Sequence, residues 1–389
     1  MVFATSDIGP EEQAVLALID ELRSELSDRV AEPRRWSGTL RKMTFARAVQ
    51  GSNSIEGYDA SLDDVVAAVE GEPTLDAGEE TTLALAGYRD AMTYLLQIAD
   101  QDVVVDEGLL KSLQFMMLKH DLRKNPGRWR PGAIFVRREA TGEVVYEGPP
   151  WEAIPDLIAE WLGELEDDES PVLVKAAMAH LNLVLIHPFS DGNGRMGRAV
   201  QTLLLARDRL IAPIFSSIEE FLGRNTQSYY DVLSDVGGGS WQPSRNARAW
   251  VRFCLRAHYL QMQTTLRRNH EIESLWRSCL DLTIQKQLPE RVAAGLMDAA
   301  YGLRVRRGGY QRAVESMFGD EISGLTASRD LKAMVDAQLL DPIGENRGRY
   351  YVGSEDLREL HGEIRRGRPP RADADPFEIV TDRNQLKLG

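Results

Sequence analysis

Twelve consecutive residues, His187 to Arg198, combine the side-chain types that handle a phosphorylated substrate. Glycines in a turn that opens into a helix bring backbone N–H groups, and the positive end of the helix dipole, close to an anion. Gly192 and Gly194 are the glycines of this turn. Arg195 and Arg198 follow three residues apart on one helix face, so we expect both guanidinium groups to bind oxygens of the same polyphosphate.

Two more side chains of the segment suit the chemistry itself. Asp191 offers the single carboxylate that Mg²⁺ needs when it also binds substrate phosphates. His187 is then available to take a proton from an attacking hydroxyl. A core histidine or a simple turn would explain each feature alone, and only their combination favours a catalytic site.

The segment resembles the motif of the Fic family, H-x-F-x-(D/E)-G-N-G-R-x-x-R, at every specified position. Fic proteins are helical enzymes, most of which transfer AMP from ATP to a Ser, Thr or Tyr hydroxyl of a target protein. The resemblance implies a protein adenylyltransferase that uses ATP and Mg²⁺, with His187 as general base and Asp191 as metal ligand. The nucleotide-binding residues that it implies in the motif are Asp191, Gly192, Asn193, Gly194, Arg195, Gly197 and Arg198.

Composition is consistent with such an enzyme. A chain of 389 residues predicts two or three domains. Two cysteines, Cys254 and Cys279, and the lack of a leader-like start predict a cytoplasmic protein. A net charge of −14 argues against a protein that coats nucleic acid. The most apolar stretch, Pro171–Ile186, is too short and too interrupted to span a membrane, so we expect no membrane role.

Helical periodicity dominates the chain, and it predicts a mainly α fold. Val172–Ile186 is apolar on nearly all sides, which predicts a buried central helix that ends at His187. Phe189 is expected to anchor the loop by packing between this helix and the next one. The predicted helices up to residue 208 are Glu11–Arg29, Leu62–Val69, Thr82–Asp100, Glu107–His120, Trp151–Leu165, Val172–Ile186 and Gly194–Asp208.

Between Arg128 and Pro150 two short β-type runs surround Thr141-Gly142, which predicts a hairpin. A surface excursion would give the same pattern. The family resemblance implies a flap that clamps the target by strand-like pairing. The flap residues that it implies are Ile134, Phe135, Val136 and Arg137, framed by Gly127, Arg130, Pro149 and Pro150. Arg137 and Arg138 depart from the smaller or polar residues of many relatives, which leaves a preference for acidic targets open.

Upstream, the run Ser52-Asn-Ser-Ile-Glu56-Gly57 fits the (S/T)-x-x-x-E-(G/N) inhibitory motif that some Fic proteins carry. By itself the run is equally a polar helix end that stops at Gly57. The resemblance implies that Glu56 pairs with Arg198 and keeps it from the γ-phosphate. In some relatives the same glutamate aligns water to remove AMP from a modified target, so the direction of the reaction stays open.

Beyond the motif, Ser217–Asp235 predicts further helix. The resemblance implies that Tyr229 or Tyr230 borders the adenine, whereas their residue type alone favours a core position. Gly237 stands where some relatives have an asparagine, so that base contact is not expected.

The last hundred residues predict a small winged helix. Leu288–Leu303 begins a helical stretch, Ser328–Leu340 is an amphipathic helix, and Asp341–Val352 has two β-prone ends around a glycine-rich turn. Charges there are nearly balanced, whereas a DNA reader shows a basic footprint. A protein-interaction or dimerisation module is therefore favoured over DNA binding, although five arginines could cluster. They are Arg304, Arg306, Arg307, Arg347 and Arg349.

We therefore predict a mainly α, Fic-type helical core with a β-hairpin flap and a small C-terminal winged helix. The expected boundaries are 1–100 for an N-terminal helical region with the inhibitory motif, 101–260 for the catalytic core, 261–289 for connecting helices, 290–362 for the winged helix and 363–389 for a flexible tail. The expected partners are a target protein with a hydroxyl side chain and, from the family, a second copy of the chain. The alternative is a DNA-binding regulator or scaffold whose nucleotide pocket senses a ligand.

Overall fold

The structure, a computed structural model, describes residues 1–5, 7–31, 34–101, 103–138, 141–345, 348–368 and 374–388. It is mainly helical, as the periodicity predicts. Up to the motif the helices are α1 (Pro10–Ala31), α2 (Ser37–Ser54), α3 (Leu62–Glu70), α4 (Glu79–Ile98), α5 (Glu107–Leu118), α6 (Ile154–Asp167) and α7 (Val172–Ile186). From the motif onward they are α8 (Asn193–Arg207), α9 (Glu219–Arg224), α10 (Thr226–Gly237), α11 (Arg248–Gln285), α12 (Ala293–Ala300), α13 (Arg307–Phe318), α14 (Gly324–Asp336), α15 (Glu355–Arg366) and α16 (Pro376–Leu388).

Short 3-10 turns and two hairpins complete the described structure. The 3-10 turns are η1 (Leu122–Lys124), η2 (Trp151–Ala153), η3 (Pro213–Phe215) and η4 (Glu290–Val292). The antiparallel hairpins pair β1 (Phe135–Arg137) with β2 (Val144–Glu147), and β3 (Leu340–Ile343) with β4 (Tyr350–Gly353).

Helix α7 lies in the centre of the first core because almost every side of it is apolar. Leu181 and Ile186 are fully buried, and the helix packs mainly against α8 and α11. Trp250 of α11 donates its indole N–H to the Ala177 carbonyl at 2.7 Å, which satisfies the one polar atom of that buried ring. The C-terminal end of α7, where His187 follows, is therefore fixed by packing on several sides.

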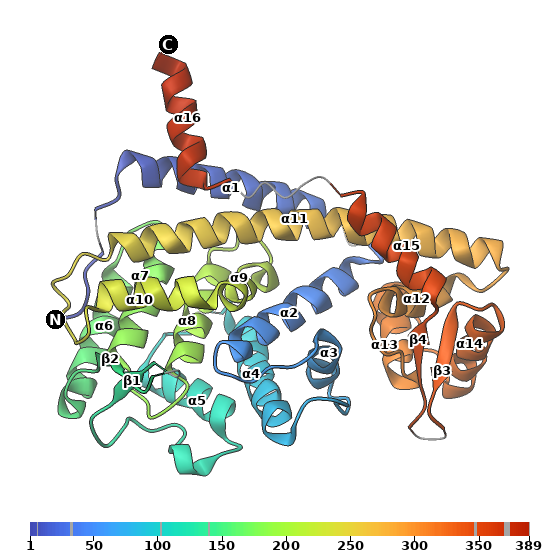
Figure 1. The fold of residues 1–389 in the computed structure, drawn as a ribbon, viewed down its shortest axis with the longest axis horizontal. Coiled ribbons are helices and arrows are strands. Elements are labelled where there is room, and N and C mark those ends of the chain that lie inside the picture. Colours follow the sequence, from blue (N-terminus) through green and yellow to red (C-terminus); the bar gives the residue numbers. More distant parts are fainter. Residues whose placement is uncertain are drawn as a thin grey trace.

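Helix α11 connects the two hydrophobic cores of the molecule. Its 38 residues extend about 57 Å, from the core around α7 to the C-terminal helices (Figure 1). We expected a boundary between residues 260 and 261, but α11 passes through it without a break. The N-terminal residues 1–100 do not form a core of their own either, because α1 packs along α11 and α4 packs against α5.

The C-terminal module contains α12, α13, α14 and the β3–β4 hairpin, followed by α15. Its amphipathic helix is α14, which begins and ends earlier than the predicted Ser328–Leu340. Ser323 caps its N-terminus by accepting from the Thr326 N–H, and Gln338 has a φ of 63° that prevents the helix from continuing. Leu340 therefore begins β3.

Two of the five arginines that suggested a DNA-binding cluster contact the N-terminal region. Arg304 Nη2 lies 2.5 Å from an Asp64 carboxylate oxygen, and Arg306 Nη1 lies 3.5 Å from Glu72. Arg347 lies outside the described residues. Arg304 and Arg306 are therefore paired with carboxylates of α3 and the segment after it, whereas Arg307 and Arg349 are exposed, and DNA binding by this module stays an untested alternative.

The expectation of a flexible tail from residue 363 was wrong for much of that segment. Helix α15 extends to Arg366, and α16 packs on α1 with Phe377 and Val380 buried (Figure 1). The Arg252 guanidinium lies 3.9 Å from the centre of the Phe377 ring. The proline residues and charges of this segment suggested disorder. The buried contacts of Phe377 and Val380, and the contact of Arg252 with the Phe377 ring, hold α16 in place instead. Within the described residues no helix has the length and apolar character needed to cross a bilayer.

Helices α2 and α9 approach until their backbones touch, and this contact positions the run Ser52–Gly57. A Cβ on Gly51 would lie 2.4 Å from the Glu219 carbonyl oxygen, and one on Gly223 would lie 2.5 Å from the Gly51 Cα. Both positions therefore require glycine. Ser52 follows directly, so the depth at which α2 sits also sets the position of Ser52 and Glu56.

We predict that Gly51→Ala lowers the free energy of unfolding by about 1–3 kcal/mol, because backbone atoms must move apart. Gly163→Ala in α6 is the matched control, since nothing lies within 4 Å of the added methyl group. It is expected to stabilise by about 0.5–1 kcal/mol through helix propensity. Urea unfolding measures both, and equal effects of the two substitutions would contradict the close contact.

Candidate active site

His187 lies directly after α7 and takes a left-handed backbone conformation, with φ 52° and ψ 56°. This conformation costs a non-glycine residue about 1–2 kcal/mol, so the surroundings must hold it. Its N–H still bonds to the Leu183 carbonyl at 3.1 Å, which closes the last helical turn. The chain then reverses. The half-buried imidazole therefore lies at the start of the loop that leads to α8.

The hydrogen bond of its ring fixes the tautomer of His187. Nδ1 lies 3.0 Å from the Val184 carbonyl oxygen. A carbonyl oxygen only accepts, so Nδ1 carries the proton and Nε2 keeps a lone pair. Burial lowers the pKa of His187 below its ordinary value, against the opposing effect of the Val184 hydrogen bond. The ring is therefore neutral near pH 7, with Nε2 able to accept a proton.

Arg130 holds the backbone at His187 in place. Its Nε donates to the His187 carbonyl at 2.8 Å, and its two Nη groups donate to the Gly132 and Pro149 carbonyls at 2.5 Å. The Arg130 N–H also bonds to the Pro188 carbonyl at 2.9 Å. One buried guanidinium thus ties the residue after α7 to both ends of the flap segment.

Asn193 braces the turn between α7 and α8. Its side-chain oxygen accepts from the Phe189 N–H and its amide donates to the Phe189 carbonyl, both at 2.9 Å. Phe189 is fully buried, with its ring centre 4.8 Å from that of Trp129. The amide of Asn193, which we expected at the nucleotide, is therefore occupied within the loop, and Phe189 anchors the loop as its residue type suggests.

Arg195 is buried without a hydrogen-bond acceptor. The residue is 0% exposed, and none of its three guanidinium nitrogens has a partner among the described residues. Its nearest carboxylate oxygen belongs to Asp191, 3.8 Å away, and the Tyr58 ring covers it with 5.4 Å between Cζ and the ring centre. A buried cation that lacks acceptors is costly, so this position suits an anion near the N-terminus of α8.

Two of the three guanidinium nitrogens of Arg198, Nε and Nη2, donate to hydrogen-bond acceptors. Its Nε donates to the Ser52 hydroxyl at 2.8 Å, and its Nη2 donates to the Ser52 carbonyl at 3.0 Å and to Glu56 Oε1 at 2.7 Å. The residue is 1% exposed, whereas the Glu56 side chain is 21% exposed. Despite burial, the charge of Glu56 raises the pKa of Arg198 above its ordinary value. Gly57 follows with a φ of 81° and turns the chain toward Tyr58.

Gly194 and Gly197 have different surroundings although both belong to the motif. A Cβ on Gly194 would lie 2.5 Å from Glu56 Oε1, so this glycine admits the carboxylate beside Arg198. A Cβ on Gly197 would lie 2.6 Å from His180 Cδ2. Gly197 therefore lets α7 and α8 pack closely, and its predicted contact with the nucleotide stays a prediction.

Asp191 is the one motif carboxylate, and it has partners of its own. Oδ1 accepts from the Gly192 N–H at 2.6 Å, and Oδ2 lies 2.6 Å from Lys124 Nζ. Hydrogen bonding to Lys124 holds the pKa of Asp191 below its ordinary value, although burial opposes this. Among the described residues no three His, Cys, Asp or Glu side chains gather to hold a metal. A single ionised carboxylate fits Mg²⁺ only if substrate phosphates complete the coordination.

The flap lies beside this site. Phe135 pairs with Glu147 and Val136 with Tyr146 in the β1–β2 hairpin, and Ile134 precedes β1 and accepts from the Gly148 N–H at 3.2 Å. The Tyr146 hydroxyl donates to the Leu185 carbonyl at 2.7 Å, which anchors the hairpin to α7.

The two edges of this hairpin differ. The outer edge of β2 is taken, because the Glu147 N–H bonds to Gly239. The outer edge of β1, which includes Arg137, pairs with no described strand. Arg137 itself donates to the Gly142 carbonyl at 3.0 Å.

The two tyrosines of α10 lie in different environments. Tyr229 is 1% exposed, with its hydroxyl 3.0 Å from His180 Nε2. Tyr230 is 45% exposed, and its hydroxyl donates to the Ile55 carbonyl at 2.9 Å. Tyr229 is thus a core residue in this structure, and Tyr230 is the member of the pair that can contact a base.

Several residues that organise the site carry no local sequence signal. Gln114 donates to the Asp191 carbonyl at 3.0 Å and accepts from the Gly127 N–H at 2.5 Å. Lys124 neutralises Asp191, and Tyr58 covers Arg195. All three lie more than sixty residues from their motif partners, and only the fold brings them there.

Comparison with known proteins agrees with this geometry. Residues 105–205 match the model of the Fic/DOC family. A Nematostella vectensis protein named Protein adenylyltransferase Fic is 26% identical over 254 residues, which cover 63% of this chain and 54% of that protein. Protein adenylyltransferase fic-1 of Caenorhabditis briggsae is 33% identical over 106 residues, which cover 25% of this chain and 20% of that protein. The chain thus spans about half, or less, of the length of these relatives.

Solved structures share the fold. A Fic family protein from Desulfovibrio desulfuricans G20 aligns with a TM-score of 0.58 at 22% identity, over 90% of this chain and 98% of that one. A Fic-1 fragment from C. elegans aligns with a TM-score of 0.52 at 21% identity, over 66% of this chain and 72% of that one.

We predict that NMR titration places the pKa of His187 below its usual value of about 6.5, with the Nδ1–H tautomer above that pKa. The reason is burial of the ring and its bond to Val184. A spectrum of His187→Ala assigns the resonance among the six histidines. Because the Glu56 charge raises this pKa, Glu56→Gln is expected to lower it further. An Nε2–H tautomer would contradict the assignment of Nε2 as the base.

Proposed function

We propose that this chain is a protein adenylyltransferase, because residues 105–205 match the model of the Fic/DOC family. It moves AMP from ATP to a hydroxyl side chain of a target protein or of itself. The observation that carries this proposal is that one short motif supplies both a neutral His187 imidazole, with Nε2 able to accept a proton, and a buried Arg195 guanidinium that lacks an acceptor among the described residues.

In the proposed reaction the target hydroxyl oxygen attacks the α-phosphorus of ATP. His187 Nε2 takes the hydroxyl proton, a new oxygen–phosphorus bond forms, and the bond to pyrophosphate breaks. Positioning and neutralisation of charge supply most of the catalysis in such transfers. Arg130 contributes by fixing the carbonyl of the residue that carries the base.

The phosphates are proposed to bind at the start of α8. Arg195 can donate all its guanidinium N–H groups to them, since no described residue uses these groups. Arg198 Nη1 also has no hydrogen-bond acceptor among the described residues. Asp191 would hold Mg²⁺, which neutralises phosphate charge when bound. Lys124 must then release the Asp191 oxygen that it contacts.

The target segment is proposed to add as a strand to the outer edge of β1. That edge pairs with no described strand, whereas the edge of β2 is already bonded to Gly239. Main-chain pairing gives affinity with little dependence on sequence. Phe135 is 45% exposed and offers an apolar contact to the bound segment.

Residues 56–58 are proposed to keep the enzyme inactive. Glu56 binds Arg198 and Tyr58 covers Arg195, so one short segment engages both motif arginines. Glu56 therefore competes for the guanidinium that the γ-phosphate would use, and its carboxylate adds a like charge. Activation requires that this segment move away.

The reverse reaction is a second candidate for the same site. Glu56 binds Arg198 through Oε1, and its Oε2 has no hydrogen-bond partner among the described residues. A carboxylate oxygen in that position can orient a water molecule toward an AMP–protein ester. Release of AMP from a modified target by the wild type, and its loss in Glu56→Gly, would support this direction.

Labelling with ATP that carries label on the α-phosphate tests the forward reaction. We predict weak self-labelling of the wild type and an increase of at least about tenfold for Glu56→Gly, which corresponds to removing about 1.4 kcal/mol of competition. His187→Ala in the same background is expected to lose about 10²–10⁴-fold in rate, the usual contribution of a general base.

ATP labelled on the γ-phosphate is the control for this experiment, since transfer of AMP leaves that label in pyrophosphate. Glu56→Gln keeps the side-chain size and should fall between wild type and Glu56→Gly. Label that remains after His187→Ala, or label that comes from the γ-phosphate, would overturn the proposed chemistry.

Thermal unfolding tests autoinhibition without any target. We predict that Mg-ATP raises the Tm of Glu56→Gly more than that of the wild type, because ATP need not displace a carboxylate in the variant. Without ATP the variant should melt at a lower temperature, since Arg198 loses its charged partner. Equal ATP-induced shifts in both proteins would show that Glu56 does not compete with the nucleotide.

A further inference from the structure

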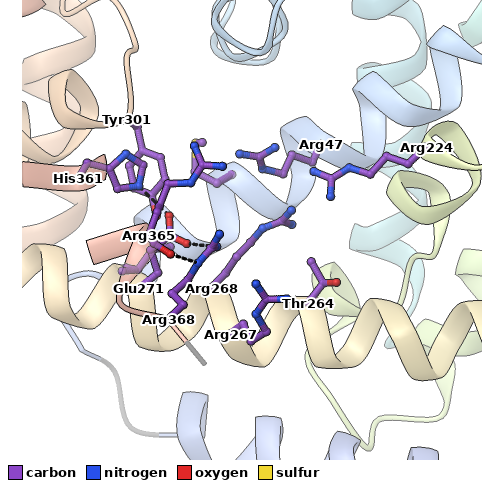
Figure 2. Close-up of a pocket in the computed structure, with 12 residues that line it drawn as sticks. Arg47, Arg224, Thr264, Arg267, Arg268, Glu271, Tyr301, His361, Arg365 and Arg368 are labelled. Atoms are coloured by element: carbon purple, nitrogen blue, oxygen red, sulfur yellow. Dashed lines mark hydrogen bonds and ion pairs between the residues drawn. The ribbon is translucent and has the colours of Figure 1, made fainter. Parts of the chain in front are cut away.

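A second basic cavity lies away from the motif, between α2, α11 and α15. Its volume is about 320 Å³, at the lower end of ligand-binding cavities. Figure 2 shows arginines that enter it from different walls, with Arg47 and Arg365 directed toward each other. The lining residues are Met43, Arg47, Arg224, Thr264, Arg267, Arg268, Glu271, Ile272, Tyr301, His361, Arg365 and Arg368.

Positive charge exceeds negative charge around this cavity. Six of the lining residues are arginines and one is a glutamate. Glu271 is held by His361 at 2.7 Å and by Arg368 at 2.6 Å. A second carboxylate, Glu220, binds Arg268 through both of its oxygens and also Arg224. Arginines therefore outnumber glutamates among the residues that line this cavity.

Two of these arginines make no ion pair with a described residue. Arg47 makes no ion pair with any described residue, and its buried Nε lacks a hydrogen-bond acceptor. Burial and the neighbouring Arg268 lower the pKa of Arg47 to about 10, against the opposing effect of Glu220. Arg365 makes no ion pair with a described residue, although its charge contributes to the lowered pKa of Glu271, and it lies opposite Arg47 on α15 (Figure 2). Like charges that converge without acceptors indicate that an anion stabilises them.

We propose that this cavity binds a compact anion with at least two phosphate groups, such as an inorganic polyphosphate or the phosphate chain of a nucleotide. Planar guanidinium groups bind phosphate oxygens in pairs, and several convergent arginines match several oxygens better than a single ion. The enclosed volume admits a small ligand and excludes a nucleic-acid duplex. The site is separate from the motif, because no residue from 187 to 198 lines it.

Tripolyphosphate is the probe, and the full-length chain in 150 mM salt is the sample. Calorimetry compares the wild type with Arg47→Gln/Arg365→Gln. The matched control is Arg41→Gln/Arg358→Gln, which removes two exposed charges from the same two helices. Loss of two charge-assisted contacts should weaken binding by about 100-fold or more in the cavity variant and little in the control. Circular dichroism and the Tm test whether each variant is folded. Arg365→Gln alone is a second variant for the same measurement, because this position is exposed and the substitution should not disturb folding.

Arginine modification by phenylglyoxal, read by mass spectrometry, places the ligand. We expect tripolyphosphate to protect Arg47 and Arg365 while Arg41 stays reactive. ATP and GTP should protect them equally, which would assign recognition to the phosphate chain. Protection of Arg195 and Arg198 alone, equal affinity for sulfate and tripolyphosphate, or unchanged binding by the cavity variant would each overturn the proposal. Because this readout needs no transfer of AMP, it stands or falls independently of the proposed activity.

Discussion

The charge of Arg198 is the constraint on which the arrangement of the site depends. A guanidinium that is 1% exposed must find acceptors, and here they are the Ser52 hydroxyl, the Ser52 carbonyl and one oxygen of Glu56. Those acceptors come from the end of α2, whose depth is set by backbone contact between Gly51 and α9. The same guanidinium is the group that a nucleotide γ-phosphate would need in the proposed reaction. In the proposed function, the catalytic and inhibitory states would therefore be alternative ways to satisfy one buried charge.

The rest of the site is built to hold its residues still. His187 keeps a left-handed backbone because α7 is packed on several sides and because Arg130 donates to the His187 carbonyl. Asn193 closes the turn by bonding to both backbone groups of Phe189. Such preorganisation suits a transfer reaction in which placement and charge matter more than covalent chemistry. In contrast, the groups expected to move, Glu56 and Lys124, make contacts through long side chains that can exchange partners.

Parts of the fold and of the candidate site could be predicted from the sequence. The physical reason why a residue could or could not be placed differs from one residue to the next. The motif from His187 to Arg198 was recognisable because its members are neighbours in the chain. Many of the helices followed from apolar periodicity, whereas the run Ser52–Gly57 is ambiguous by itself and its inhibitory role stays a prediction. Gln114, Lys124 and Tyr58 were missed because they reach the site only through the fold. Gly197 was expected at the nucleotide, yet its neighbour is His180, since one helix presents different faces to the ligand and to the core. The prediction of a flexible tail was wrong for another reason. The proline and charged residues of that segment dominated its composition, whereas two buried apolar residues, Phe377 and Val380, hold α16 in place.

The central claim is that Arg198 exchanges Glu56 for the γ-phosphate while His187 stays in place. A crystal structure of Glu56→Gly with Mg²⁺ and a non-hydrolysable ATP analogue tests it most directly. The account predicts the Arg198 guanidinium on the γ-phosphate, Arg195 on the phosphate chain, and His187 Nε2 facing the α-phosphorus with Nδ1 still on the Val184 carbonyl. A nucleotide bound elsewhere, or one that leaves both guanidinium groups without phosphate contacts, would contradict it.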